Sequence, residues 1–268
     1  DYVSKEVINV RENVGLIEVA NFSKHEFKGP DARKFLDHIM AGRLPKPGRI
    51  SLSPMLSYRG KLCGDLTVAC LDENEFMVFG SGAAQEMHRR WFESHLDKFN
   101  LSYSNRSDEY HGLSIAGPNS RKVLEKIVRD DVSNEKFKFR DSRRMFVGGV
   151  PAIINRISFT GELGYEIYVA PHYQLKLYEE LMEAGKEFNI KPFGGRALMS
   201  MRLEKNWGAW TLDYRPDFTA KETGLDAFIN WDKEFIGKES AQKENSSNKL
   251  VPLIAVSYTH LRAHETTC

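Results

Sequence analysis

Glu166 is the acidic residue whose sequence context is most typical of a ligand-binding site. It lies in residues 165–169, where apolar and polar side chains alternate as they do along a β-strand. In such a strand Glu166 and Tyr168 share one face, and Phe159 can approach them across a tight turn at residues 161–164. A carboxylate between aromatic rings, beside glycines that admit a close ligand, suits a flat heterocycle with polar edges. Spacing alone favours a plainer alternative, a hairpin that carries a solvated glutamate on its outer face.

Asp65 is a second candidate, and the residues around it leave its role open. It begins the strand-like residues 65–71 and directly follows Gly64 and a turn. An aspartate in such a place is commonly a turn cap, because its side chain accepts hydrogen bonds from nearby backbone N–H groups. The pattern is therefore compatible with a structural role and with a chemical one.

Composition argues against several classes of function. The 38 Lys and Arg residues nearly balance the 37 Asp and Glu residues, so a net charge of +1 gives no electrostatic reason to expect nucleic acid or a membrane surface as a partner. No apolar run is long enough to span a bilayer, and no signal-peptide pattern opens the sequence. The three cysteines form no CxxC pair, so we expect a reducing compartment, the cytoplasm. The eight histidines are scattered without metal-ligand spacing, and we expect no metal site.

One glycine cluster resembles a cofactor motif but lacks its later positions. Residues 80–85 begin like the dinucleotide-binding pattern GxGxxG, but Gln85 stands where the third glycine belongs. No acidic residue follows a second strand at the required distance. We therefore predict no flavin-binding or nicotinamide-binding site in this chain.

Two segments of the chain share one design. Residues 29–36 and 117–124 both begin with Gly-Pro, align without a gap and continue with the apolar spacing of a helix. Each follows a strand-like segment, which for the first is residues 23–28. The repetition predicts an α+β fold of two intertwined, pseudo-duplicated halves, about residues 14–110 and 111–244, with largely antiparallel sheets.

Hydrophobic periodicity and turn residues place the remaining elements. We expect an antiparallel meander, an amphipathic helix with Met87 on its apolar side, further strands that lead into the hairpin of Glu166, and three later helices. The expected strands are residues 52–58, 65–71, 75–80, 137–141 and 145–156, the helices are residues 83–99, 173–188, 196–204 and 238–243, and residues 244–249 are a linker.

The two ends of the sequence suggest a fragment. Residues 3–13 have a helical pattern that starts without an initiating Met. Residues 250–256 are strand-like, whereas residues 257–268 lack periodicity and resemble translated adapter sequence, so we expect a non-native tail there.

Three stretches resemble motifs of the aminomethyltransferase family, which includes the T-protein of the glycine cleavage system. Residues 156–169 resemble its folate-binding hairpin, residues 55–68 its segment MLxxxGxxxxDLTV, and residues 196–210 its segment RALxSLRLEKxxxxW. More narrowly, the chain resembles the folate-binding C-terminal half of dimethylglycine and sarcosine dehydrogenases. The resemblance implies a folate-binding domain over residues 1–244, followed by a linker and the first strand of a truncated C-terminal β-barrel over residues 245–256.

The same resemblance implies roles for individual residues. Glu166 matches the acidic residue that grips the pterin edge of tetrahydrofolate, and Asp65 matches the catalytic aspartate at the reactive N5 and N10 edge. Phe159 stands where an aromatic residue, usually Tyr, packs on the cofactor, so a tyrosine hydroxyl contact is missing here. Trp207 is a stacking candidate, and Tyr168 completes the implied folate-binding set.

The helix before Trp207 departs from the family pattern. Its folate-binding arginine corresponds to Leu198, and Arg196 is the nearest arginine. Arg202 and Glu204 are expected to form a structural ion pair.

The implied function is one-carbon transfer to tetrahydrofolate. In the dehydrogenase branch, an upstream flavin domain oxidises an N-methyl amine to an iminium, whose carbon is captured as 5,10-methylenetetrahydrofolate. The implied partners are therefore tetrahydrofolate, a small iminium, and an FAD-containing upstream domain that is not in this chain. Two alternatives remain open: a stand-alone aminomethyltransferase that acts with a lipoyl carrier protein, and a non-catalytic domain of this fold that serves as an interaction module.

Overall fold

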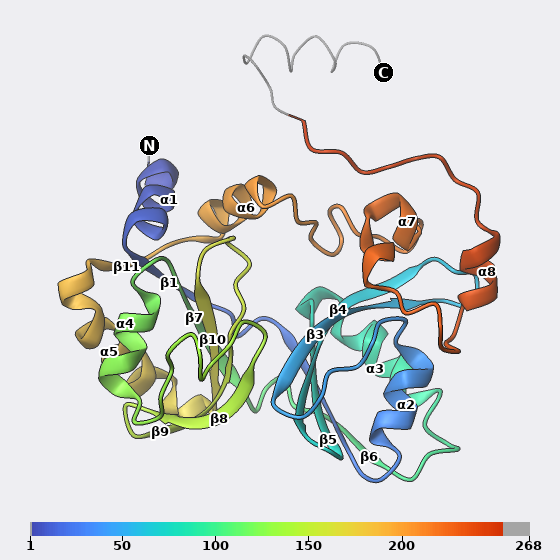
Figure 1. Cartoon of the computed structure of the whole chain (residues 1–268), viewed down its shortest axis with the longest axis horizontal. Helices are drawn as coiled ribbons and strands as arrows, with labels where there is room; N and C mark the ends of the chain where they lie inside the picture. The colour runs from blue at the N-terminus through green and yellow to red at the C-terminus, as the bar shows by residue number, and fades with distance from the viewer. Residues whose placement is uncertain (1, 254–268) are drawn as a thin grey trace.

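The computed structural model describes residues 2–253 and shows an α+β fold built on two sheets. The inner faces of the sheets meet, and helices cover their outer faces (Figure 1). All the described strand pairs are antiparallel except that of β1 with β11, so the predicted fold class is confirmed. The six-stranded sheet has the order β11 (Ile190–Pro192), β1 (Val14–Glu18), β7 (His111–Ala116), β10 (Gly164–Val169), β9 (Val150–Asn155), β8 (Ser142–Val147). The five-stranded sheet has the order β3 (Arg49–Leu56), β4 (Leu62–Asp72), β5 (Glu75–Gly80), β2 (Ser23–Lys28), β6 (Ser102–Asn105).

Each sheet is covered by a pair of amphipathic helices. Leu124 of α4 and Leu181 of α5 are buried against the six-stranded sheet, and Phe35 of α2 and Phe92 of α3 are buried against the five-stranded one. Burial of such apolar side chains is the main favourable contribution to folding. The helices on the outer faces are α2 (Ala32–Ile39), α3 (Gln85–Glu93), α4 (Ser120–Ile127) and α5 (Gln174–Gly185), and short 3-10 turns lie at Gly82–Ala84, Pro171–Tyr173, Lys186–Phe188 and Leu225–Phe228.

A smaller core joins the two sheets. Tyr168 of β10 stacks on Phe79 of β5, with ring centroids 4.6 Å apart and planes 28° apart, and Ile50 and Ile153 pack beside them. The two halves are also intertwined in sequence, because β1 lies in the sheet whose other strands all follow residue 110.

The two Gly-Pro segments adopt the same backbone conformation. Gly29 and Gly117 have φ angles of +136° and +132°, in a region that favours glycine, and each stands three residues before the first residue of a helix. A Cβ atom at Gly117 would lie 2.5 Å from the carbonyl oxygens of Val10 and Asn13. The glycine is therefore required twice, once in each half, as the repeated sequence suggests.

Helix α1 (Tyr2–Glu12) lies near α6 (Gly195–Glu204) (Figure 1), and its side chains contact both ends of α6. The Glu6 carboxylate accepts a hydrogen bond from the backbone N–H of Gly194 at 2.9 Å, just before α6 begins. At the other end, Arg11 pairs with Glu204 at 2.6 Å. This pairing fixes the position of the segment that leaves α6.

The predictions for residues 137–141 and 83–99 are wrong. Residues 137–141 form a turn rather than a strand, because Arg140 has a φ angle of +68° and the Asp141 carboxylate accepts a hydrogen bond from the backbone N–H of Lys138 at 2.8 Å. The helix predicted to reach residue 99 ends at Glu93, and Met87 is 40% exposed because the buried positions of α3 are His88 and Phe92.

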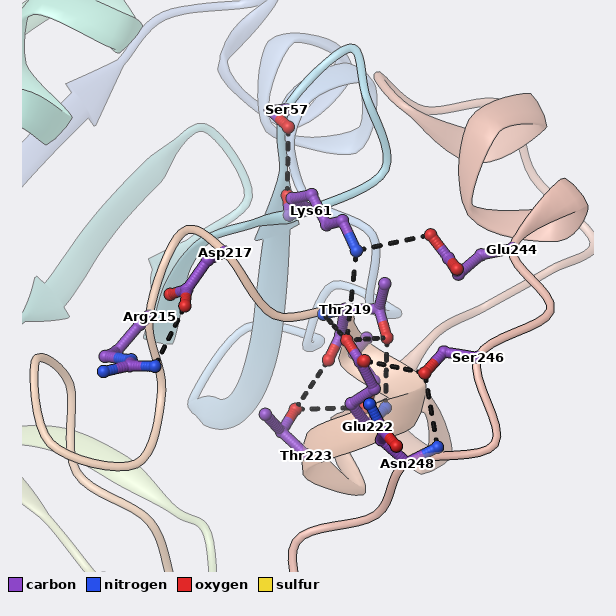
Figure 2. A network of polar contacts seen from close by, with 11 residues as sticks. Ser57, Lys61, Arg215, Asp217, Thr219, Glu222, Thr223, Glu244, Ser246 and Asn248 are labelled. Atoms are coloured by element: carbon purple, nitrogen blue, oxygen red, sulfur yellow. Dashed lines mark hydrogen bonds and ion pairs between the residues drawn. The ribbon is translucent and has the colours of Figure 1, made fainter. Parts of the chain in front are cut away.

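The chain after α6 crosses to the five-stranded sheet, where α7 (Ala220–Thr223) and α8 (Lys238–Lys243) lie (Figure 1). Figure 2 shows Glu222 at the centre of a polar network there. Glu222 and Thr219 form a capping box, and the Ser246 hydroxyl donates to the other Glu222 oxygen at 2.7 Å. The backbone N–H of Leu250 donates to the Glu222 carbonyl at 2.7 Å. These hydrogen bonds hold the chain around the predicted linker, residues 244–249, against α7.

Part of the predicted C-terminal region lies outside the described residues. Residues 250–253 are not in a strand, and the rest of the strand predicted for residues 250–256, like the tail predicted for residues 257–268, lies beyond residue 253. Across residues 2–253, none of the helices has the length and apolar character needed to cross a membrane.

Candidate functional site

Glu166 lies on the inner face of β10, in the middle of the six-stranded sheet. Tyr165, Ile167 and Val169 point into the outer core, so Glu166 and Tyr168 face the other sheet, as the alternation predicts. The Tyr168 hydroxyl donates a hydrogen bond to Glu166 Oε2 at 2.8 Å. Only 7% of Glu166 is exposed, so the expectation of a solvated glutamate is wrong.

Burial and the neighbouring polar groups have opposite effects on the ionisation of Glu166. Burial raises the pKa of this carboxyl to about 7, whereas the Tyr168 hydroxyl and the ammonium groups of Lys205 and Lys24 act in the opposite direction. Lys24 is itself fully buried on β2, which lowers its pKa to about 8, and it donates to the carbonyl oxygens of Ala20 and Phe22. Near neutral pH, Glu166 can therefore be ionised or protonated.

The inner face of β10 also has unused hydrogen-bonding capacity. Glu166 Oε1 has no hydrogen-bond partner among residues 2–253. Asn155 of β9 lies directly opposite Glu166, and its Nδ2 atom is buried without a partner in the described structure. A free acceptor and a free donor lie side by side on this face.

Asp65 lies on the facing surface of the other sheet. Phe79 of β5, which stacks on Tyr168, is directly opposite Thr67 of β4 and Lys24 of β2, and opposed residues point to the same face. Asp65 is two residues before Thr67 and shares that face, because side chains alternate along a strand. The two candidate carboxylates therefore belong to the inner faces of opposite sheets.

Asp65 is partly exposed, and its side chain has no hydrogen-bond partner on another residue within the described chain. Although the residue is partly exposed, burial of its carboxyl group raises the pKa of Asp65 to about 7. Tyr214 lies close enough for the Asp65 charge to contribute to its raised pKa, although burial is the larger cause. Asp65 can hold or release a proton near neutral pH.

Phe159 lies in a loop rather than across a tight hairpin turn. Strand β9 ends at Asn155, and residues 156–163 are irregular because side-chain hydrogen bonds replace the strand ladder. Ser158 Oγ accepts from the backbone N–H of Thr160 at 3.1 Å, and Thr160 Oγ1 accepts from that of Glu162 at 3.2 Å. Phe159 is partly exposed on this loop.

Trp207 lies just after α6, where the chain begins to cross between the sheets. Its ring is partly exposed and meets Phe228 edge-on, with centroids 5.6 Å apart. Lys205 Nζ lies 5.3 Å from the centre of the Trp207 ring and donates to the carbonyl oxygen of Ser158 at 2.8 Å. Lys205 therefore connects Trp207 with the loop that carries Phe159.

The expected ion pair between Arg202 and Glu204 is wrong. Arg202 pairs with Asp213 at 2.6 Å and donates to the Trp207 carbonyl oxygen at 2.8 Å, whereas Glu204 pairs with Arg11. Arg202 therefore holds the segment after α6 in place. Leu198 packs against the core between α1 and α6.

Sequence reasoning missed Lys24 and Lys205. Lys24 occupies an alternating strand in which a lysine is expected to face solvent, and only its register with Phe79 places it inside. Lys205 stands one residue after α6, outside any periodic pattern, although it belongs to the motif of residues 196–210. No group of three or more His, Cys, Asp or Glu residues that could hold a metal ion occurs in the part of the chain that the structure describes.

Comparison with known proteins decides the family. The model of the GCVT N-terminal domain matches residues 1–233. The chain belongs to this family. This GCVT domain is 30% identical over 261 residues to an aminomethyltransferase of Desulfitobacterium hafniense (strain Y51), covering 95% of the chain and 71% of that enzyme.

The GCVT domain is also similar to a longer enzyme. It is 36% identical over 246 residues to mitochondrial dimethylglycine dehydrogenase of Mus musculus, which covers 90% of the chain but only 28% of that protein. Its fold matches that of the glycine cleavage system aminomethyltransferase T from Bartonella henselae, with a TM-score of 0.81, 23% identity, and coverage of 90% of this chain and 65% of that one. The predicted relationship to both branches is confirmed.

Proposed function

We propose that this GCVT domain binds tetrahydrofolate between its two sheets and serves one-carbon transfer as the folate module of an enzyme like dimethylglycine or sarcosine dehydrogenase. The observation that carries the proposal is the pair Glu166 and Asp65. They lie on the inner faces of opposite sheets, and each has acceptor capacity that no other described residue uses.

The residues present fit a reduced pterin. Its edge offers adjacent N–H donors, which suit the free Oε1 atom of Glu166, and the unpaired Asn155 amide offers a further polar contact. Tyr168 is buried and donates to Glu166, so its role in this proposal is to orient the carboxylate rather than to stack on the ligand. The partly exposed rings of Phe159 and Trp207 are the stacking surfaces.

Asp65 is the catalytic residue of the proposal. When bound, tetrahydrofolate supplies the amine nitrogens that accept the carbon unit. Asp65 orients an N–H group at that edge and stabilises positive charge on the transferring carbon, and its pKa of about 7 lets it hold or release a proton at neutral pH. The segment after α6 limits the access of water on the same side, because Tyr214 is buried next to Asp65.

The proposal also concerns the source of the carbon unit. An iminium delivered by an FAD-containing upstream domain is favoured by the 36% identity to dimethylglycine dehydrogenase, of which the chain spans about a quarter. A stand-alone aminomethyltransferase is the second candidate, because the chain covers 71% of such an enzyme. The compartment, expected to be the cytoplasm, stays a prediction.

Calorimetric titration of the purified chain with 5-formyltetrahydrofolate, a stable reduced folate, tests the binding step. We expect saturable binding of one molecule per chain. Absence of binding would contradict the proposal and favour a non-catalytic interaction module. Carbon transfer from an aminomethyl-loaded lipoyl carrier protein to tetrahydrofolate would favour the stand-alone enzyme over the dehydrogenase module.

A further inference from the structure

Lys205 connects three parts of the proposed site. Its ammonium group donates to the Ser158 carbonyl oxygen at 2.8 Å and lies 5.3 Å from the centre of the Trp207 ring. Its side chain passes over Gly161, where an added Cβ would lie 3.5 Å from the Lys205 Cβ. The side chain thus extends from the end of α6 across the loop of residues 156–163.

The ammonium group of Lys205 lies on the same side of β10 as Glu166, although the two form no ion pair within 4.0 Å in the described chain. Its acceptor Ser158 packs against Gly164, where an added Cβ would lie 2.6 Å from Ser158 Cβ, and Gly164 shares the inner face of the strand with Glu166. Lys205 is an exposed residue, but neighbouring atoms around its nitrogen partly exclude water and lower its pKa, and the negative charge of Glu166 partly offsets this effect. An ammonium group has three N–H donors, of which Ser158 takes one. The charge of Lys205 is therefore available to the inner face of β10.

The other groups around Glu166 are less able to balance its charge. Tyr168, on the same strand, contributes a neutral hydroxyl, and Asn155 on β9 is neutral. Lys24, on β2, is positive, but its ammonium group is already engaged by the carbonyl oxygens of Ala20 and Phe22 at 2.7 and 2.6 Å. Lys24 therefore has one N–H donor without a described acceptor, whereas Lys205 has two.

The nearby arginines have other partners. Arg202 is paired with Asp213, and Arg11 bridges Glu162 and Glu204. Arg196 is exposed and has no described contact with this site.

We propose that Lys205 is a positioning residue of the folate site, which keeps Glu166 ionised so that both of its carboxylate oxygens can accept hydrogen bonds. This inference rests on the proposed function for its purpose, but the electrostatic attraction between Lys205 and Glu166 belongs to the free protein. A protonated Glu166 would present an O–H donor to the N–H donors of a pterin, so the positive charge of Lys205 favours the form that binds.

The direct test is the titration of Glu166 in the ligand-free protein, followed by carbon-13 NMR of glutamate carboxyl groups. Glu166→Gln assigns the signal. Lys205→Met removes the charge and keeps a long side chain, and we expect it to raise the midpoint of Glu166 by about half a pH unit or more. Lys205→Arg should restore the midpoint, and Lys191→Met, at an exposed lysine of β11, should leave it unchanged.

The functional test is the affinity for 5-formyltetrahydrofolate between about pH 6 and pH 8.5. Affinity should fall as the pH drops through the pKa of Glu166, which is about 7 in the native chain. In Lys205→Met this fall should occur at higher pH, so that affinity drops about twofold or more near pH 7 and about threefold or more at pH 6, whereas Lys205→Arg keeps the native profile. If Lys205 only held the end of α6 against Ser158, its replacement would weaken binding by the same factor at every pH.

The two experiments separate the inference from the proposed function. An unchanged Glu166 midpoint in Lys205→Met overturns the inference, whether or not folate binds. A shifted midpoint in a protein that binds no folate supports the electrostatic effect of Lys205 on Glu166 and overturns the proposed function instead.

Discussion

Replacing Tyr168 by phenylalanine isolates one hydrogen bond at the centre of the site. The hydroxyl donates to Glu166 Oε2 at 2.8 Å, and both residues are buried. Tyr168→Phe keeps the ring and its stacking on Phe79 at 4.6 Å, so the loss is confined to the hydroxyl. A hydrogen bond to a buried charged group contributes about 1.5–3 kcal/mol, and we expect the free energy of unfolding to fall by about 2 kcal/mol at pH 8. In a domain of this size the melting temperature should fall by roughly 4–8 °C.

The pH dependence of this loss is its most specific feature. The pKa of Glu166 in the folded chain is about 7, above its ordinary value of 4.5, so the carboxyl is mainly ionised at pH 8 and mainly protonated at pH 6. The missing hydroxyl destabilises the ionised form most, so the loss should be smaller at pH 6. Urea denaturation of both proteins at the two pH values measures it. Tyr178→Phe, on the exposed side of α5, is the matched control and should be neutral. An equal loss at both pH values, or none at pH 8, would refute the reasoning.

Three further predictions test other parts of the account. Asp65→Asn should bind 5-formyltetrahydrofolate within a few-fold of the native chain but lower carbon transfer by about a hundredfold or more in the reconstituted enzyme, and equal transfer would exclude a catalytic role. Glu222→Ala removes a capping box, so the free energy of unfolding at pH 7 should fall by about 0.5–2 kcal/mol. Hydrogen bonds lower the pKa of the Glu222 carboxyl in the folded chain, so this loss should shrink as the pH falls below about 4.5. The control Glu239→Ala, on α8, should leave the free energy of unfolding unchanged. Gly117→Ala should lower the melting temperature by several degrees, because the new Cβ meets backbone oxygens at 2.5 Å, whereas Gly195→Ala, with nothing within 4 Å, should not.

Much of the fold is predictable because its local patterns agree with the tertiary structure. The strand at Ser23–Lys28 and the helix at Lys238–Lys243 have the predicted bounds. The repeated Gly-Pro segments predicted two equivalent strand-to-helix units, and both glycines have positive φ angles. Hydrophobic periodicity and the position of glycine specify such elements, and both can be read directly from the sequence.

The errors occur where side chains replace backbone pairing or where register decides burial. Residues 156–160 alternate like a strand, but Ser158 and Thr160 form local hydrogen bonds that end the ladder at Asn155. The burial of Lys24 follows only from its pairing with Phe79, a contact 55 residues distant in sequence. Motif resemblance singled out Glu166 and Asp65 as candidates, whereas the cations that face Glu166 depend on how the strands and the end of α6 are placed.

The most direct test of the central claim is the affinity of Glu166→Gln for 5-formyltetrahydrofolate, measured by calorimetry at pH 8. Glutamine keeps the size of the side chain but replaces one acceptor oxygen by an N–H donor that faces the N–H donors of the pterin. The loss of charge-assisted hydrogen bonds should weaken binding by about tenfold or more, while Glu187→Gln, at an exposed surface pair with Lys126, should bind like the native chain. Native affinity in Glu166→Gln would contradict the account, because the inner face of β10 would then not be the folate site.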